Sequence, residues 1–229
     1  MKKILIGMET SGQLRNRFRT KGFDAWSIDI LPSVDNSPYH IQGDVFDYLN
    51  NSGVDWDLGI FHPPCTYLTC SAEWAYKEPD YTRYPNVGYH QKVKEGTLVG
   101  KDRWAARTSA YKDFVACLEN DKCKRIAVEN PIGYVNRWRK PRQIIQPYQF
   151  GDDASKATCL WLKGLPNLKP TKRVQGRIVN GKERWSNQTD SGQNKLAPSN
   201  DRWSVRSKTY DGIADAMVEQ WSKVLLDSD

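Results

Sequence analysis

Short apolar runs alternate with segments of helical period along most of the chain. Strand-like runs are expected at residues 3–8, 25–30, 39–45, 56–61 and 124–128, each bounded by polar or turn-forming residues. Helical spacing of apolar positions is found at residues 14–21 and 103–119. This alternation predicts an α/β domain built on a doubly wound, mostly parallel sheet.

The last third of the chain departs from this alternation. Residues 157–162 are expected to form one strand of an antiparallel pair, and residues 209–226 a closing amphipathic helix. Between them, residues 164–206 are rich in Gly, Pro, Asn, Lys and Arg and show little apolar periodicity. With 229 residues and no internal repeat, we expect residues 1–229 to form a single domain, with at most a small appendage.

A long polar and aromatic segment, residues 70–102, also lacks a clear period. Loops of this length are uncommon unless they are lids or binding loops. Its Trp and Tyr residues stand among Lys and Arg, an arrangement that can stack nucleic-acid bases and pair phosphates. The same aromatics can equally close a small local core, and the sequence leaves both interpretations open.

Residues able to carry chemistry stand at the ends of successive expected strands. Asp29, Asp44, Cys65 and Glu129 each lie at or just beyond the carboxyl end of one strand. In a parallel sheet these ends share one edge, and open α/β sheets bind their ligands there. We therefore expect two carboxylates, a thiol and a third carboxylate to converge on one site.

The stretch from Phe61 to Cys65 carries the sharpest chemical signal. Pro63 and Pro64 lack backbone N–H groups, so the chain must leave the sheet there in a stiff turn. Cys65 stands just beyond this turn and is a candidate nucleophile. On local grounds a buried structural cysteine is the alternative.

The opening unit, a strand, turn, helix and second strand, resembles a nucleoside site. Small residues in the turn at 9–12 let a ligand approach, and Asp29 can accept hydrogen bonds from ribose hydroxyls. The turn lacks the complete GxGxxG pattern, so Asp29 could as well be a solvated turn acid.

Composition narrows the class of protein. The formal charge of +7 suits a polyanionic partner, although a solvated basic face gives the same value. Arg137 and Arg139 belong to a basic cluster suited to phosphate contacts or to simple solvation. Five cysteines without a CxxC pair indicate neither a disulfide framework nor a metal site. No apolar run approaches the roughly 18–20 residues of a membrane span, and we expect a soluble cytoplasmic protein.

Two motifs resemble those of a known family. Pro63-Pro64-Cys65 and Glu129-Asn130-Pro131, in this order, resemble the Pro-Pro-Cys and Glu-Asn-Val signatures of the carbon-5 cytosine-specific DNA methyltransferases, specifically the compact phage-type members. Residues 150–162 are similar to the family's block that supplies basic groups before a strand, with Lys156 in place of the usual arginine pair. Residues 210–217 are similar to the motif that returns to the cofactor site.

The chain departs from the family at two places. Members open with Phe-x-Gly-x-Gly, whereas residues 7–12 read Gly-Met-Glu-Thr-Ser-Gly. The target-recognition region could only be the short insert at residues 164–206. Sequence specificity would then be relaxed, shared with the loop at 70–102, or supplied by a partner.

The resemblance implies a Rossmann-like, S-adenosylmethionine-dependent methyltransferase fold and transfer of a methyl group to carbon-5 of cytosine in DNA. Cys65 would add to carbon-6 of a flipped-out cytosine, Glu129 would hold the ring nitrogen and amino group, and Asn130 would position the Pro-Pro turn. We expect a monomer. The resemblance assigns cofactor binding to Met8, Glu9, Ser11, Gly12, Asp29, Ile30, Asp44 and Pro63, and substrate binding to Pro64, Asn130, Lys156, Arg137 and Arg139.

Other functions stay open on the sequence. An amino-group methyltransferase of adenine or cytosine uses an Asp/Ser-Pro-Pro-aromatic turn without a thiol, and Tyr67 lies close enough to keep this alternative. A non-catalytic DNA-binding homologue is favoured slightly by the incomplete opening motif. A different transferred group, or a nucleotide substrate not in DNA, is the third alternative.

Overall fold

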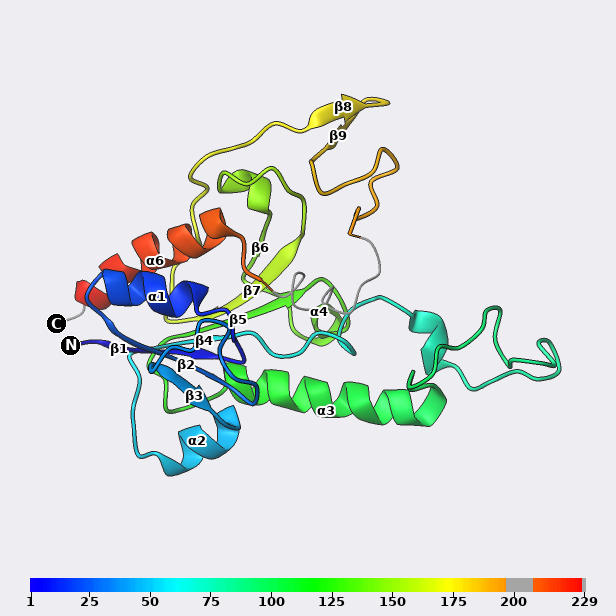
Figure 1. Ribbon diagram of the computed structural model, residues 1–229, viewed down its shortest axis with the longest axis horizontal. Helices are drawn as coiled ribbons and strands as arrows, with labels where there is room; N and C mark the ends of the chain where they lie inside the picture. Colours follow the sequence, from blue (N-terminus) through cyan, green and yellow to red (C-terminus); the bar gives the residue numbers. More distant parts are fainter. Residues whose placement is uncertain (197–207, 228–229) are drawn as a thin grey trace.

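A seven-stranded sheet with the order β3-β2-β1-β4-β5-β7-β6 forms the centre of the molecule (Figure 1). The computed structural model describes residues 1–196 and 208–227. Five neighbouring strands are parallel: β3 (His40–Gln42), β2 (Asp24–Asp29), β1 (Lys3–Gly7), β4 (Leu58–Phe61) and β5 (Ile126–Pro131). Strand β7 (Thr158–Lys163) runs antiparallel to β5 and to β6 (Gln143–Ile145).

Helices cover both faces of this sheet. On one face lie α1 (Gln13–Thr20) and α6 (Asp211–Leu226), and on the other α2 (Val45–Asn51) and α3 (Gly100–Leu118) (Figure 1). Shorter turns are η1 (Glu73–Tyr76), α4 (Val135–Trp138) and η2 (Pro147–Gln149). The predicted fold class is confirmed in its architecture: the fold is α/β and Rossmann-like, doubly wound and mostly parallel, with an antiparallel strand near the end of the chain.

The strand sequences explain the two cores. Side chains alternate between the faces of a strand, and in β1 Ile4 and Ile6 join the core under α1 and α6 whereas Leu5 joins the core over α2 and α3. Because both faces are covered, the strands are continuous apolar runs rather than alternating ones. In α6, Met217 and Trp221 lie one helical turn apart and both are buried.

Some expected boundaries were wrong. The strand expected at 39–45 covers only His40–Gln42, because Asp44 instead caps a helix that begins at Val45. The strand expected at 124–128 continues to Pro131, because β7 pairs with it as far as Thr158. The short strands β6, β8 (Arg177–Val179) and β9 (Lys182–Arg184) were not expected, since they are too short or too polar to show periodicity.

Two projections stand on the side of the molecule opposite the two termini (Figure 1). The first, here called the arm, comprises residues 70–99 and extends beyond the amino end of α3. The second, here called the lobe, comprises residues 164–196 and carries the β8–β9 hairpin. The rest of the expected recognition insert, residues 197–206, lies outside the described residues.

Some aromatic residues of the arm pack against one another in a small local core. Trp74 packs against Tyr89 with ring centroids 5.1 Å apart, and Tyr76 and Tyr89 are buried. These rings form the small local core that was one of the two interpretations. Tyr81 is 61% exposed and is not part of it.

None of the helices in the described part of the chain combines the length and apolar character that a bilayer crossing needs.

Candidate active site

The turn after β4 presents Cys65 beyond the carboxyl edge of the sheet. The backbone N–H of His62 donates to the carbonyl oxygen of Gly7 at 3.0 Å, the last contact with β1. After the two prolines, the N–H groups of Leu68 and Thr69 both donate to the Cys65 carbonyl, at 2.9 and 3.0 Å, and close the turn. The Cys65 side chain is exposed, as a nucleophile requires.

Asn130 fastens this turn to the neighbouring strand. Its buried side-chain amide donates to the carbonyl oxygen of Pro63 at 2.9 Å. The proline has no N–H to hold it in a ladder, so this bond fixes the turn relative to β5. Asn130 therefore positions the turn, as the sequence suggested, and any contact of Asn130 with substrate stays a prediction.

Glu129 lies next to this bond, one residue before Asn130, with its side chain 18% exposed. Burial by itself would raise the pKa of the Glu129 carboxyl. The hydrogen bond from His62 and the charges of Lys156 and His62 outweigh burial, so this pKa lies below its usual range. Glu129 is therefore ionised at neutral pH and acts as an acceptor of hydrogen bonds.

Lys156 reaches this site because β7 runs antiparallel to β5. The start of β7, at Thr158, pairs with Pro131 at the carboxyl end of β5. The residues just before β7 are thereby brought to the same edge, and the charge of Lys156 acts on Glu129. The sequence predicted Lys156 as a basic contributor, and the structure brings the two residues together.

His62 was not among the predicted site residues. Its Nδ1 lies 3.3 Å from Oε2 of Glu129, and its side chain is 9% exposed. The only sequence signal was its place between an apolar strand and the Pro-Pro turn. Its partner is 67 residues away along the chain, and no local pattern reports such a contact.

Asp29 and Ile30 lie at the carboxyl end of β2. Asp29 Oδ1 accepts a hydrogen bond from the Leu31 N–H at 2.9 Å. Partial burial raises the pKa of the Asp29 carboxyl, with the charge of Glu9 acting in the same direction. Ile30 is 69% exposed beside it. A partly desolvated acid next to an exposed apolar side chain suits the ribose and base of a nucleoside.

The turn after β1 is held by its own side chains. The hydroxyl of Ser11 and the N–H of Gly12 both donate to the carboxylate of Glu9, the latter at 3.1 Å. Met8 and Gly12 have φ angles of 60° and 70°. A Cβ on Gly12 would stand 2.2 Å from the guanidinium of Arg15, so this glycine is required by the fold.

Asp44 is the N-cap residue of α2. Its Oδ1 accepts from the N–H groups of Phe46 and Asp47, at 2.8 and 2.9 Å, as an N-cap residue does. The side chain is otherwise exposed. Its predicted contact with the cofactor stays a prediction.

The two predicted arginines of the basic cluster point to different partners. Arg137 lies 3.7 Å from Glu73 of the arm. Arg139 donates to Glu119 at 2.6 Å, where α3 ends. The structure therefore places Arg137 nearer the arm and ties Arg139 to α3, and substrate binding by either stays a prediction.

Arg107 is a second residue that the sequence did not single out. It is buried in α3, and its Nε and Nη2 donate to the carbonyl oxygens of Tyr67 and Thr69 at 2.7 and 3.2 Å. Nη2 also pairs with Glu73 at 2.7 Å, and the guanidinium lies 3.4 Å from the ring centroid of Tyr76. Arg107 thus fastens the segment that follows Cys65 onto α3.

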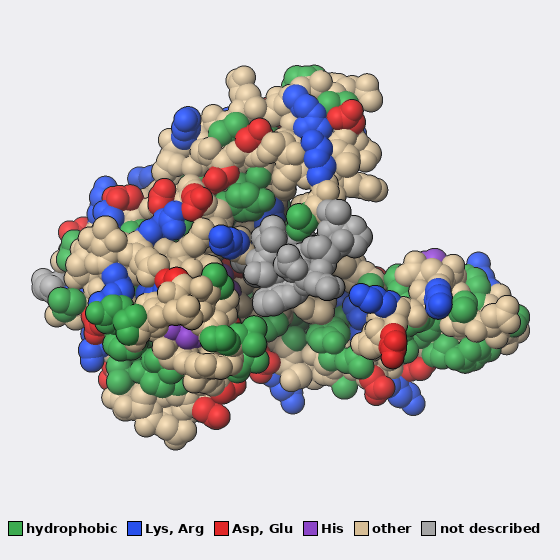
Figure 2. Space-filling view, in the orientation of Figure 1, with side chains coloured by type: hydrophobic (Ala, Val, Ile, Leu, Met, Phe, Trp, Pro, Cys, Tyr) green, Lys and Arg blue, Asp and Glu red, His purple; other side chains and the backbone are tan. Residues whose placement is uncertain are grey.

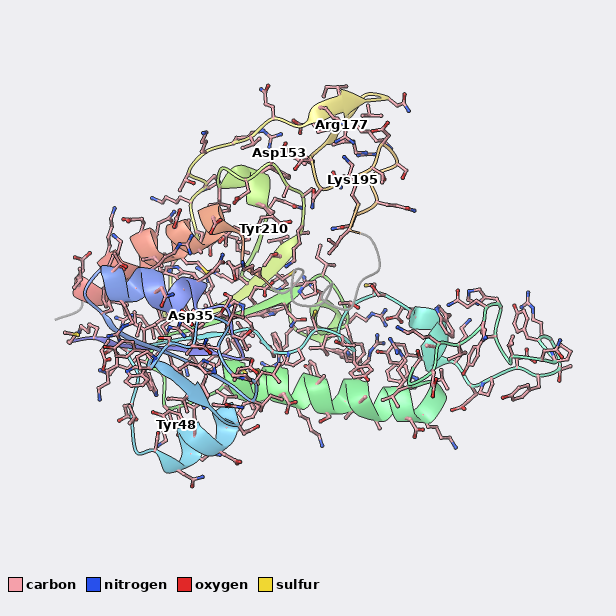
Figure 3. The ribbon with its side chains drawn as sticks, viewed as in Figure 1. Asp35, Tyr48, Asp153, Arg177, Lys195 and Tyr210 are labelled. Carbon is pink, nitrogen blue, oxygen red and sulfur yellow. The ribbon has the colours of Figure 1, made fainter. Side chains whose placement is uncertain are left out.

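The lobe concentrates positive charge. Residues 164–196 contain seven Lys or Arg residues and two Asp or Glu residues, and Figure 2 shows Lys and Arg side chains over this part of the surface. Arg177 of the lobe (Figure 3) is itself exposed and donates to Trp185, Gln188 and Asp190. Arg177 stabilises the hairpin, and the exposed lysines provide the charge on its surface.

The two solved structures described below are similar to this chain in fold, with 13% sequence identity. No protein-family model and no curated protein matches the chain. One similar solved structure is a proposed DNA modification methyltransferase encoded within a prophage (E. coli), with 13% identity, a TM-score of 0.38, and coverage of 71% of this chain and 46% of that chain. Another is a triple mutant of Spodoptera frugiperda DNMT2, with 13% identity, a TM-score of 0.35, and coverage of 80% and 57%.

The chain spans about half the length of these solved structures.

Proposed function

We propose that this chain transfers a methyl group from S-adenosylmethionine to carbon-5 of cytosine in DNA. The observation that carries the proposal is the bond from the Asn130 amide to the Pro63 carbonyl. It links the Pro-Pro-Cys turn after β4 to the Glu-Asn pair on β5. An exposed thiol and an ionised carboxylate are thereby displayed on adjacent strands at one edge.

These two groups suit addition to a pyrimidine. Carbon-5 of cytosine is a weak nucleophile. Addition of the Cys65 thiolate to carbon-6 forms a C–S bond and moves electron density onto carbon-5. Glu129 accepts a hydrogen bond from the exocyclic amino group, and its protonation as the adduct forms lets it donate to the ring nitrogen, where negative charge develops. S-Adenosylmethionine supplies the electrophilic methyl group. Loss of the proton from carbon-5 and of the Cys65 thiolate from carbon-6 then restores the aromatic ring.

The first part of the sheet fits the nucleoside half of this cofactor. Asp29 offers a partly desolvated carboxyl for ribose hydroxyls, and the exposed Ile30 offers an apolar face. In the turn after β1, both carboxylate oxygens of Glu9 accept bonds from the turn itself. We propose that the backbone of Met8, Ser11 and Gly12 faces the methionine half of S-adenosylmethionine.

The two projections suit a nucleic-acid substrate. The lobe provides positive charge for phosphates, and the arm adds exposed Tyr81. Both stand beyond the edge that holds Cys65 (Figure 1). A cytosine stacked inside a duplex would have to leave the helix to reach the thiol. That the protein is a monomer and acts in the cytoplasm stays a prediction.

The test incubates purified protein with unmodified single- and double-stranded DNA and labelled S-adenosylmethionine, followed by mass spectrometry of the digested nucleosides. Cys65→Ala is compared with Cys70→Ala, because Cys70 is also exposed and lies five residues away. We expect 5-methylcytosine from the wild type and from Cys70→Ala, and none from Cys65→Ala.

Two results would contradict the proposal. Methylated amino groups that survive Cys65→Ala would assign the chain to the amino-group methyltransferases. An absence of product together with an absence of cofactor binding would favour a non-catalytic DNA-binding homologue.

A further inference from the structure

Three successive carbonyl groups at the end of β2, those of residues 29–31, are held by β3 and the residue after it. The first accepts from the Gly43 N–H at 2.9 Å, the second from the side-chain amide of Gln42 at 3.2 Å, and the third lies 2.9 Å from Nε2 of His40. The paired register of the two strands ends with Asp29 opposite Gln42. Beyond this point, side chains of β3 take the place of backbone donors.

This segment carries the side chains that the proposed function assigns to the nucleoside half of the cofactor. Asp29 is partly buried, and Ile30 and Leu31 are 69% and 44% exposed. Oδ1 of Asp29 also accepts from the N–H of Leu31 at 2.9 Å. The backbone is therefore fixed by the protein itself, while the side chains of Ile30 and Leu31 face solvent, where a ligand can reach them.

A chain of hydrogen bonds runs from α1 through His40 to this segment. A carbonyl oxygen only accepts hydrogen bonds, so the contact with Leu31 requires a proton on Nε2 of His40. In the neutral ring, Nδ1 then accepts from the hydroxyl of Ser27, 2.8 Å away. The Ser27 oxygen in turn accepts from the buried guanidinium of Arg15 at 2.6 Å. Gln42 is exposed, so water competes for its bond and His40 is the firmer support.

The loop that follows this segment is also tied down at its far end. The N–H of Val34 donates to the carbonyl oxygen of Thr10 at 2.9 Å, in the turn after β1. Asp35 pairs with Arg15, the same residue that orients Ser27. The loop is thus held at both ends, and His40 acts at the end next to Asp29.

We propose that His40 is a positioning residue for the adenosine half of S-adenosylmethionine, holding residues 29–31 so that Asp29 meets the ribose and Ile30 the base. This inference rests on the proposed function. His40 acts through the Leu31 carbonyl and takes no part in methyl transfer. Loss of this bond therefore weakens cofactor binding and leaves DNA binding and the chemical step unchanged.

Two substitutions separate the two nitrogens of His40. The amide nitrogen of His40→Gln can reach the place of Nε2 and keep the bond to Leu31, but it loses the acceptor for Ser27. The shorter His40→Asn keeps an amide near Ser27 and loses the donor to Leu31. Each variant loses one of two bonds, so a merely structural histidine would be affected similarly by both. His90→Asn is a matched control, because His90 is exposed on the arm.

The first experiment needs no turnover. Nitrogen-15 NMR of the histidine rings identifies the protonated nitrogen, and titration calorimetry measures binding of S-adenosylmethionine. We expect the Nε2-protonated form of His40 in the wild type. His40→Asn should bind the cofactor about five- to tenfold more weakly, the loss of about one hydrogen bond. His40→Gln and His90→Asn should bind it as the wild type does.

Three results of this experiment would overturn the inference. They are a proton on Nδ1 of His40 instead of Nε2, equal weakening in His40→Gln and His40→Asn, and unchanged cofactor binding in His40→Asn. Wild-type protein that bound no S-adenosylmethionine would overturn both this inference and the proposed function. Urea unfolding of each variant verifies that the measured protein is folded.

The second experiment measures methyl transfer to DNA over a range of cofactor concentrations. We expect His40→Asn to raise the KM for S-adenosylmethionine by the same factor as the dissociation constant, with kcat and the KM for DNA unchanged. A lower kcat at saturating cofactor would contradict a positioning role. Weaker cofactor binding by His40→Asn, without methyl transfer to any DNA by the wild type, would refute the proposed function and leave positioning by His40 intact. Transfer to cytosine with cofactor binding insensitive to His40→Asn would refute the inference alone.

Discussion

Buried charged side chains hold the loops around the candidate site in place, and Arg15 is the clearest example. This arginine is fully buried in α1, where it donates to Ser27 at 2.6 Å and pairs with Asp35. Asp35 also accepts from Asn16 at 2.9 Å and lies close to α1 (Figure 3). Together these bonds hold the loop after β2, next to Asp29.

This pair predicts a pH-dependent stability. Burial alone would raise the pKa of Asp35, but the bonds from Asn16 and Arg15 and the Arg15 charge lower it to about 2. A depressed folded-state pKa stabilises the protein above the unfolded value of about 3.9 and ceases to do so as pH falls towards 2. Because the Asp35 side chain is 34% exposed, we expect Asp35→Asn to cost only about 1–2 kcal/mol at pH 7.

Urea unfolding at pH 7, 4 and 2.5 measures this difference. The difference between the two proteins should fall to about a third of its pH 7 value at pH 2.5, whereas Glu95→Gln, which removes a charge from an exposed position of the arm, should match the wild type throughout. A difference between wild type and Asp35→Asn that persisted unchanged at pH 2.5 would contradict the assignment.

Among single residues, the sequence predicts functional side chains that directly follow a strand. It does not predict those whose partners are distant along the chain. Cys65 and Glu129 were found because strand ends can be located from local apolar runs. His62 and Arg107 were missed because their partners lie 67 and up to 40 residues away. Asp44 was correctly placed after a strand, but its role as a helix cap depends on a short helix without a clear period.

Among the secondary-structure elements, α3 does more than cover the sheet. The buried Arg107 connects it to the backbone of the segment after Cys65 and to Glu73. The hydrogen bond from Arg107 lowers the pKa of Glu73, and the Arg107 charge acts in the same direction. The base of the arm is therefore fastened to a rigid helix.

We predict that Arg107→Lys loosens this segment. Lysine has a single ammonium group and cannot reach two carbonyls and a carboxylate together. We expect a loss of about 2 kcal/mol in unfolding free energy, and amide hydrogen exchange at Leu68 and Thr69 at least about tenfold faster. Arg83→Lys, nearer the tip of the arm, is the matched control. Unchanged exchange at Leu68 and Thr69 in Arg107→Lys would show that Arg107 does not hold the turn.

Elements with strong apolar patterns were predicted well, and polar ones were not. The five parallel strands and the helices α3 and α6 follow from buried runs and helical period. Strand β9 consists of charged residues, and β8 of Arg177 followed by Ile178 and Val179, none of them fully buried. A turn at Asn180 and Gly181 joins the two strands, and their pairing depends on that turn rather than on burial. The arm has almost no regular structure, so periodicity could not describe it.

In the molecule as a whole, the sheet brings the candidate site residues to one edge, and the arm and the lobe extend on the side of that edge. The parallel strands bring Asp29, Cys65 and Glu129 to one edge, and the antiparallel β7 adds Lys156. The arm and the lobe extend on that same side, away from the termini (Figure 1). This arrangement suits the proposed reaction, because both projections lie on the side of the candidate site.

The central claim is that the Cys65 sulfur bonds to carbon-6 of cytosine. The most direct measurement uses DNA that contains 5-fluorocytosine, together with S-adenosylmethionine. Release of the enzyme requires loss of a proton from carbon-5, and fluorine cannot leave as a cation, so the adduct should accumulate. Intact mass spectrometry under denaturing conditions should show the protein joined to the oligonucleotide for the wild type and for Cys70→Ala, and not for Cys65→Ala. An adduct that persisted in Cys65→Ala, or its absence in wild-type protein that binds both DNA and cofactor, would contradict the account.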